Sequence, residues 1–212
     1  MDRREIHRTM RDEYESRWSA GDPWAGKGPS DAELTAAKNR LQGELLADRR
    51  YRRTIEVGCG NGNLTPTLAA VSDAVLSVDI AASALVHARA ACRGLGNVEF
   101  REENAVPFEY VDHGPWDLIT LVETVYSLGW LYPLFDIAWM AAQMAESLAP
   151  GGRLLLTNTY GAEKDYLLQP YLIDTYRDLF RNVGLAIVRE EVLRPANPDD
   201  GLPALVTLFA RP

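Results

Sequence analysis

The sequence predicts an α/β protein in which a mostly parallel β-sheet carries helices on both faces. From Tyr51 onward, short runs of β-branched and apolar residues alternate with segments of helical periodicity. This alternation is typical of parallel sheets, because each crossover between parallel strands needs a helix. A glycine-rich turn follows the first strand and Asp79 ends the second. Both features are typical of open α/β sheets that bind a ligand at the carboxyl ends of their strands.

Two helices are expected before the sheet, within residues 1–50. Large apolar residues recur at every fourth position of the first twenty, namely Ile6, Met10, Tyr14 and Trp18. This spacing places them on one helical face. The segment 21–30 is rich in helix breakers, and Ser30 with Glu33 then predicts a capping box for a second helix that ends near Asp48.

From residue 51 the expected elements follow one another as strand, helix and strand. The strands are 54–57, 75–79, 98–101, 118–122 and 153–157, and the helices are 63–71, 82–93 and 134–148. A further helix follows Pro170 and is expected to stop at Gly184. Two last strands, 186–193 and 204–210, flank the turn-rich "RPANPDDGLP", which suits an antiparallel pair.

Composition excludes several classes of function. The chain has 212 residues and a net charge of −8, and its one basic cluster, "DRRYRR", is too short to follow a nucleic-acid backbone. Its apolar runs fall short of the roughly 20 residues that span a bilayer, and the N-terminus lacks the apolar core of a secretory signal. Two cysteines and three histidines, all scattered, predict no metal site. We therefore expect a cytoplasmic protein without nucleic-acid or membrane partners.

The stretch "EVGCGNGNLT", residues 56–65, is the first candidate ligand site. Gly58, Gly60 and Gly62 can adopt positive φ and let a ligand approach the backbone, and the next helix presents its positive end. A dinucleotide fingerprint needs its third glycine one residue later, and a Walker loop needs Gly-Lys-Ser/Thr. The spacing therefore argues against a pyrophosphate and a triphosphate. A tight turn without a ligand is the alternative.

Asp79 is the second candidate, because it ends a strand 17 residues after Gly62. A carboxylate at this distance can accept hydrogen bonds from the two hydroxyls of a ribose. It can also cap the helix that starts near Ala82, and the two roles are compatible.

Together these motifs resemble the class I S-adenosylmethionine-dependent methyltransferases. Their first motif, an acid, any residue and G-x-G-x-G, is matched from Glu56 to Gly62. Further matches are Asp79, "NAVPF", "WDLITLVETVYSL" and "LAPGGRLLL", so the resemblance extends from about residue 51 to 157. It implies a Rossmann-like sheet of seven strands in the order 3-2-1-4-5-7-6, with strand 7 antiparallel.

Within that family the sequence is similar to the nodulation protein S-like branch. The matching motifs are "DPW", "EVGCGNGNLT", "VDIAASALVHAR" and "LVETVYSL". The chain departs from the branch at Ala82, where serine is usual, and at Ser127, where a second tyrosine stands. The branch is linked with N-methylation of a glucosamine unit in a lipo-chitooligosaccharide. Ser127 faces the expected acceptor region, so the acceptor of the branch cannot be assigned directly to this chain. An amine or amino-sugar acceptor is expected instead.

The resemblance implies S-adenosylmethionine as methyl donor and S-adenosylhomocysteine as product. The amino-acid end would meet backbone groups of the glycine turn, with Glu56 aiding the ammonium or ordering the loop. Asp79 would accept from the ribose, Ile80 would pack against adenine, and Asn104 and Ala105 would lie beside its amino group. The expected cofactor-binding residues are Trp24, Glu56, Gly58, Cys59, Gly60, Gly62, Asp79, Ile80, Asn104, Ala105, Val122 and Glu123.

Three residues are expected to act in catalysis. Glu123 ends the fourth strand, where the resemblance places the reactive methyl, and we expect it to be a general base or to orient an acceptor ammonium. Capping the next helix, or pairing with a lysine or arginine, is the alternative. Tyr126 and Tyr160 are expected to orient the acceptor, or else to serve as pocket wall. Much of the rate of an in-line methyl transfer can come from alignment and from expelling water.

Residues 1–50 are expected to form a helical lid or cap on a methyltransferase domain of residues 51–212. Tyr14, Trp18 and Trp24 can close over cofactor and acceptor with cation–π attraction, or can simply dock the helix on the sheet. We expect a small-molecule methyltransferase acting on an amine. The alternatives are an O-methyltransferase for a hydroxylated natural product, a catalytically silent cofactor-binding partner, and a nicotinamide oxidoreductase, which the glycine spacing disfavours.

Overall fold

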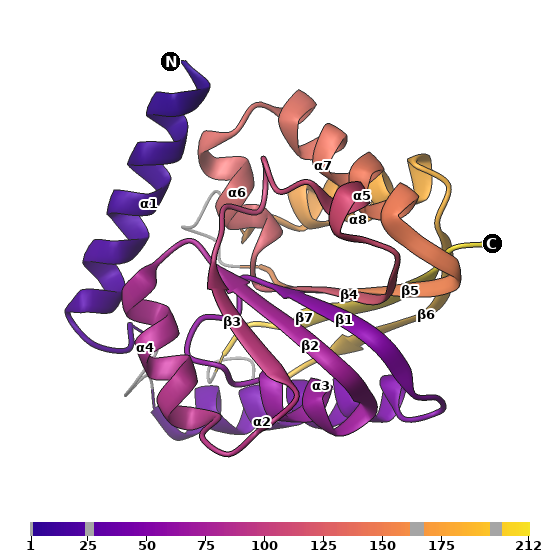
Figure 1. Ribbon diagram of the computed structural model, residues 1–212, viewed down its shortest axis with the longest axis horizontal. Coiled ribbons are helices and arrows are strands. Elements are labelled where there is room, and N and C mark those ends of the chain that lie inside the picture. Colours follow the sequence, from indigo (N-terminus) through magenta and orange to yellow (C-terminus); the bar gives the residue numbers. More distant parts are fainter. Residues whose placement is uncertain (1, 24–27, 162–167, 196–200) are drawn as a thin grey trace.

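The computed structural model, which describes residues 2–23, 28–161, 168–195 and 201–212, is built on a seven-stranded sheet. Its strands are β1 (Tyr51–Val57), β2 (Ser72–Asp79), β3 (Val98–Glu102), β4 (Trp116–Val122), β5 (Leu148–Thr159), β6 (Ala186–Leu193) and β7 (Ala204–Ala210). They lie in the order β3-β2-β1-β4-β5-β7-β6, with β7 antiparallel to both neighbours and the other pairs parallel (Figure 1). The expected strand order and the antiparallel seventh strand are confirmed.

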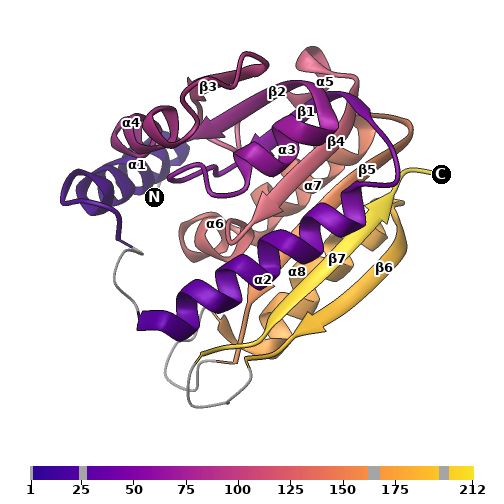
Figure 2. The same ribbon diagram turned by 90° about the horizontal axis from the view of Figure 1, so that it is seen from below.

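Helices cover both faces of the sheet. They are α1 (Arg3–Ser19), α2 (Gly28–Leu46), α3 (Thr65–Val71), α4 (Ala82–Ala91), α5 (Tyr110–His113), α6 (Val125–Leu131), α7 (Leu134–Ser147) and α8 (Pro170–Asn182). Figures 1 and 2 show α2, α3 and α4 on one face and α5 to α8 on the other. Alternate side chains of the central strands enter the two cores, so that Ile119 and Leu154 join one apolar cluster while Leu118 and Leu155 join the other.

Several elements differ from the sequence prediction. Strand β1 begins at Tyr51 and β5 at Leu148, earlier than expected, because Tyr51 pairs with Ser72 and Leu148 pairs with Trp116. Helices α5 and α6 were not expected at all. Helix α6 contains Gly129, which disfavours a helix in isolation, but a Cβ there would lie 1.8 Å from the hydroxyl oxygen of Tyr176. Packing against α8 therefore requires glycine at this position. The expected capping box depends on the Ser30 side chain, which lies outside the described residues.

Helix α1 is docked at the carboxyl end of the sheet, beside α4 (Figure 1). Of the expected apolar stripe, Ile6, Met10 and Trp18 are buried and Tyr14 is partly buried. Ile6 and Met10 belong to the larger core cluster. Glu15 accepts a hydrogen bond from the backbone N–H of Ser83, at 3.2 Å, at the start of α4. The single apolar face predicted for this helix is confirmed.

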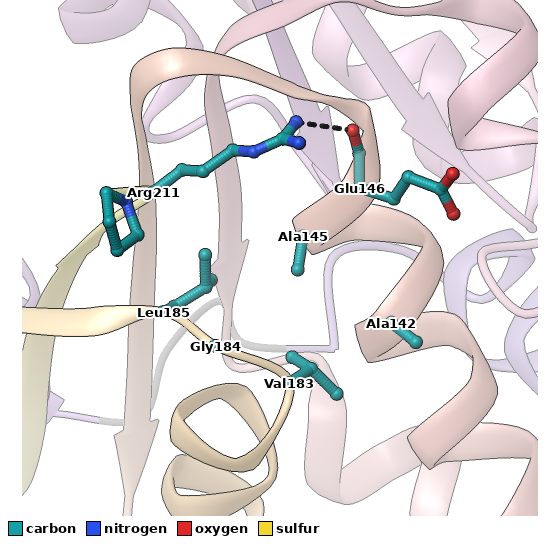
Figure 3. A pocket seen from close by; sticks show the side chains of 8 residues that line it. Ala142, Ala145, Glu146, Val183, Gly184, Leu185 and Arg211 are labelled. Atoms are coloured by element: carbon teal, nitrogen blue, oxygen red, sulfur yellow. Dashed lines mark hydrogen bonds between the residues drawn. The ribbon is translucent and has the colours of Figure 1, made fainter.

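A surface pocket of about 430 Å³ lies at the opposite end of the molecule, where α7 and α8 end (Figure 3). The guanidinium of Arg211 donates to the carbonyl of Glu146, at 2.6 Å, and to the carbonyl of Leu148. It thereby satisfies carbonyl groups at the C-terminal end of α7. Because Leu148 begins β5, this pocket adjoins the amino ends of the strands and is remote from the edge where the predicted residues gather.

Candidate active site

The candidate site lies where the strand order reverses between β1 and β4. The chain proceeds outward from β1 through β2 to β3 on one side and from β4 to β5 on the other, which opens a crevice at the carboxyl ends. Three carboxylates reach this edge from three different strands: Glu56 near the end of β1, Asp79 at the end of β2 and Glu123 directly after β4. Their carboxyl oxygens can accept hydrogen bonds from a ligand's donors.

All three glycines of the turn adopt the expected positive φ. The φ angles are +76° at Gly58, +53° at Gly60 and +82° at Gly62. A Cβ at Gly58 would lie 2.4 Å from Thr124 Oγ1, one at Gly60 would lie 3.1 Å from a ring carbon of Trp18, and one at Gly62 would lie 3.0 Å from the sulfur of Cys92. The space beside each glycine is therefore taken by the protein itself, a role that was not predicted.

Backbone N–H groups of this turn donate within the protein. Gly58 and Cys59 both donate to the carbonyl of Val78, at 2.8 and 3.0 Å, and Gly62 donates to the carbonyl of Cys59 at 2.9 Å. Gly60 donates to Asp79 Oδ2 at 2.9 Å. A ligand that leaves these bonds intact cannot accept from these four N–H groups, but it can donate to carbonyl oxygens of the turn. An ammonium group can donate in this way, whereas a phosphate oxygen cannot.

Asp79 ties the glycine turn to the start of α4. Its Oδ2 accepts from Gly60, and its Oδ1 accepts from the backbone N–H of Ala81 at 3.0 Å. The carboxyl is buried, and this desolvation raises the pKa of Asp79. This bond reaches the residue before α4, but α4 has no side-chain N-cap hydrogen bond, so the predicted capping role is not observed. Because each oxygen accepts one bond and has a second lone pair, the carboxylate retains the capacity to accept from two hydroxyls as well.

Glu56 is buried under the turn and acts on the protein itself. Its Oε2 accepts from the hydroxyls of Thr65, at 2.7 Å, and Ser77, at 2.6 Å. These bonds link β1 to the start of α3 and to β2, which is the loop-ordering role expected as one of two alternatives. Burial raises the pKa of Glu56 to about 7.

Folding stability is expected to depend on pH through Glu56. The pKa is 4.5 for the reference carboxyl and about 7 in the fold, so the folded chain binds the proton more tightly. This contribution is fully present below pH 4.5 and is lost as pH rises through 7, by up to about 3 kcal/mol. Urea unfolding at pH 5 and pH 8 should show a larger loss for the chain than for Glu56→Gln. Equal losses in both proteins would contradict the assignment.

Glu123 is held by three donors at the end of β4. Its Oε1 accepts from Lys38 Nζ at 2.7 Å and from the Thr159 hydroxyl at 2.6 Å, and its Oε2 accepts from the Thr159 backbone N–H at 3.0 Å. Its φ is +55°, which is uncommon outside glycine. The pairing with a lysine that was considered as an alternative is therefore present. Lys38 was missed because it lies 85 residues away in α2, outside any motif.

Asn104 is placed after β3 as expected, but its side chain is bonded to the protein. Its Nδ2 donates to the hydroxyl of Tyr132 at 2.8 Å, and its Oδ1 accepts from the backbone N–H of Val106 at 3.1 Å. Tyr132 follows α6 and meets the ring of His7 of α1 edge-on, with 5.9 Å between the ring centroids. Ala105 is buried beside this pair. These contacts bring α1, α6 and the loop after β3 together.

The other predicted residues border the same region. Ile80, Tyr126 and Tyr160 are partly buried against the larger core cluster, and Val122 packs on the smaller one. Tyr160 directly follows β5, and its backbone N–H donates to the carbonyl of Pro203 at 2.9 Å. Trp24 lies outside the described residues.

The described part of the chain shows neither a metal-binding cluster nor a membrane-spanning helix. Within these ranges, no group of three or more His, Cys, Asp or Glu side chains is placed to hold a metal ion. None of the helices described there combines the length and the hydropathy that a bilayer-spanning segment requires.

Comparison with known families defines the class of protein. Residues 55–152 match the family described as "Methyltransferase domain", which covers the glycine turn, Asp79 and Glu123. The strand order, with its antiparallel seventh strand, is that of the class I S-adenosylmethionine-dependent methyltransferases. This part of the chain thus matches a methyltransferase domain, and the chain has the class I methyltransferase fold.

Individual proteins refine this placement. The fold is NodS-like: the N-methyltransferase NodS from Bradyrhizobium japonicum WM9, solved with S-adenosyl-L-homocysteine, matches at a TM-score of 0.74 with 18% identity, over 98% of each chain. The 1,6-didemethyltoxoflavin-N1-methyltransferase from Burkholderia thailandensis matches at 0.73 with 14% identity, over 100% of this chain and 91% of that one.

Curated sequences add a relative with a different acceptor atom. The ubiquinone biosynthesis O-methyltransferase of Methylococcus capsulatus is 29% identical over 118 residues, which is 55% of this chain and 47% of that protein. The chain thus matches about half the length of its curated relatives.

Proposed function

We propose that this chain transfers a methyl group from S-adenosylmethionine to an amine of a small molecule. The observation that carries the proposal is the set of Glu56, Asp79 and Glu123 at the carboxyl edge, beside a turn in which the N–H groups of Gly58, Cys59, Gly60 and Gly62 already donate within the protein. S-adenosylmethionine carries an ammonium and a sulfonium and has no phosphate. An edge that offers carboxylate and carbonyl acceptors suits its ammonium and ribose hydroxyls better than it suits a nucleotide phosphate.

The residues have distinct parts in this proposal. Carbonyl oxygens of the glycine turn receive the ammonium of the cofactor, and Glu56 holds the turn in shape through Thr65 and Ser77. Asp79 accepts from the ribose hydroxyls with the lone pairs left by Gly60 and Ala81. Asn104 must exchange its bond with Tyr132 if its amide is to reach adenine, so we assign it to shaping the loop after β3.

An amine acceptor is favoured over a hydroxyl by the state of Glu123. Three donors, one of them a lysine ammonium, already bond to its carboxylate, so fewer lone pairs are left to take a proton from an acceptor hydroxyl. A hydroxyl must lose its proton to become a good nucleophile, whereas a neutral amine attacks first and is then deprotonated easily. The match to an O-methyltransferase keeps hydroxylated acceptors as the second candidate.

We further propose that the segment 1–50 is a lid on a methyltransferase domain of residues 51–212. Trp18 lies on Gly60 and Tyr14 packs against the core beside it. Closure over a sulfonium centre by these rings would exclude water from the transfer step. The two free cysteines, both buried, fit a reducing, cytoplasmic setting.

Titration calorimetry tests the proposal directly. S-adenosylhomocysteine is expected to bind with a micromolar or lower Kd, whereas NAD is expected to give no heat of binding. A panel of matched amines and phenols, assayed by mass for a methyl gain, then separates the two acceptor classes. Methylation confined to phenols would overturn the amine assignment. Binding without turnover of either class would instead indicate a silent partner protein.

A further inference from the structure

The ion pair between Lys38 and Glu123 joins the N-terminal segment to the end of the central strand. Lys38 belongs to α2, Glu123 follows β4, and their charged atoms are 2.7 Å apart. Both side chains are shielded, with 13% of Lys38 and 23% of Glu123 exposed. Surface ion pairs are worth little, but shielding from solvent strengthens the attraction and fixes the geometry.

The distribution of donors on Glu123 is uneven. Among the described residues, Oε1 receives two donors, from Lys38 and from the Thr159 hydroxyl, while Oε2 receives only the Thr159 N–H. A carboxylate oxygen has two lone pairs. Oε1 is therefore saturated, and the remaining capacity of the group lies on Oε2. The unusual backbone conformation of Glu123, with a φ of +55°, holds the side chain over Thr159 and α2.

We propose that Lys38 is a positioning residue that presents Glu123 Oε2 to the acceptor amine. This inference rests on the proposed methyl transfer and specifies how the acceptor is held. By occupying Oε1, the ammonium of Lys38 fixes the rotamer of the carboxylate. An N–H of the acceptor then bonds to Oε2, which directs the nitrogen lone pair toward the methyl group. Lys38 itself does not touch the reacting atoms.

The alternative is that the ion pair only fastens α2 to the sheet. That role predicts a loss of stability with no selective effect on the acceptor. The positioning role predicts a rise in the KM for the acceptor and a fall in kcat, because alignment is lost, without a change in cofactor affinity. The two roles therefore differ in what they change as well as in how much.

Steady-state kinetics of the whole chain with its best amine acceptor can distinguish them. Lys38→Met keeps a long unbranched side chain and removes the charge, and we expect it to lower kcat/KM for the acceptor by about 10- to 100-fold. The Kd for S-adenosylhomocysteine should change less than about twofold. Lys38→Arg should restore most of the loss. Arg40→Met, at an exposed position of the same helix, is the matched control and should behave as the unchanged chain.

Each other outcome counts against the proposal. Unchanged acceptor kinetics in Lys38→Met would overturn it, and so would a loss of cofactor binding or stability that tracks the loss of activity. If Lys38→Met fails to fold, Thr159→Val provides the second test, because it removes the other donor to Oε1 and keeps the backbone N–H. An absence of turnover in the unmodified chain would contradict the methyl transfer itself, which calorimetry and the acceptor panel examine separately.

Discussion

Replacing Asp79 with asparagine is expected to weaken S-adenosylhomocysteine binding by about 100-fold or more. The carboxylate accepts from Gly60 and Ala81 and is proposed to accept from both ribose hydroxyls. An amide has one acceptor oxygen and no charge, so one ribose bond, worth about 1.5–3 kcal/mol to a charged group, is lost and the other is weakened. Calorimetry at neutral pH measures the change. The same substitution should also lower stability, because one buried N–H then faces an NH₂ group.

A matched variant separates this local effect from a change in net charge. Asp73→Asn removes an exposed carboxylate from the other end of the same strand and should leave the affinity unchanged. If Asp79→Asn bound the ligand as tightly as the unmodified chain, the assignment of the ribose site to the end of β2 would be wrong.

Gly58→Ala is expected to destabilise the fold by about 2–5 kcal/mol, from two costs that add. A residue with a Cβ pays about 1–2 kcal/mol at a left-handed φ, and φ here is +76°. Forcing extra volume into a packed site costs about 1–3 kcal/mol more, since the added carbon would lie 2.4 Å from Thr124 Oγ1. Thr124 cannot move freely, because that hydroxyl bonds to the carbonyls of Val57 and Val122. Urea unfolding gives the total.

Gly151 provides the control for backbone strain alone. Its φ is +68° and no atom lies within 4 Å of a Cβ built there, so Gly151→Ala should cost only about 1–2 kcal/mol. Adding Thr124→Ala to Gly58→Ala removes the two nearest atoms and should recover part of the difference. Equal losses in the two single variants would show that packing at Gly58 is unimportant.

The sequence predicts the sheet well because its strands are bounded by strong local signals. The antiparallel last strand and the turn-rich connection before it follow from patterns within a few residues. Short helices were not predicted where their stability comes from tertiary packing, as in α6, where Gly129 packs against Tyr176 of α8. The start of β5 at Leu148 was missed for the same reason, because it is determined by pairing with Trp116 in β4.

The site was predicted as a set of positions and not as a set of contacts. Glu56, Asp79 and Glu123 could be placed at strand ends from the motifs alone. Their hydrogen-bond partners could not, because Lys38, Thr159 and the N–H of Gly60 approach from other elements. As a result, the sequence did not identify Lys38 as the partner of Glu123. The glycines of the turn were explained by close approach of a ligand alone, although side chains of the protein also occupy the space beside them.

The contact between Trp18 and Gly60 makes α1 part of the wall of the glycine turn. Asn61 extends this connection, since its amide donates to Asp22, at 2.7 Å, just beyond the helix. A ligand seated on the turn therefore shares its binding surface with a segment that is distant in sequence. By thermodynamic linkage, the binding free energy that the ligand gains from docked α1 equals the amount by which the bound ligand raises the free energy of undocking α1. Ligand affinity and the free energy of docking α1 are therefore coupled.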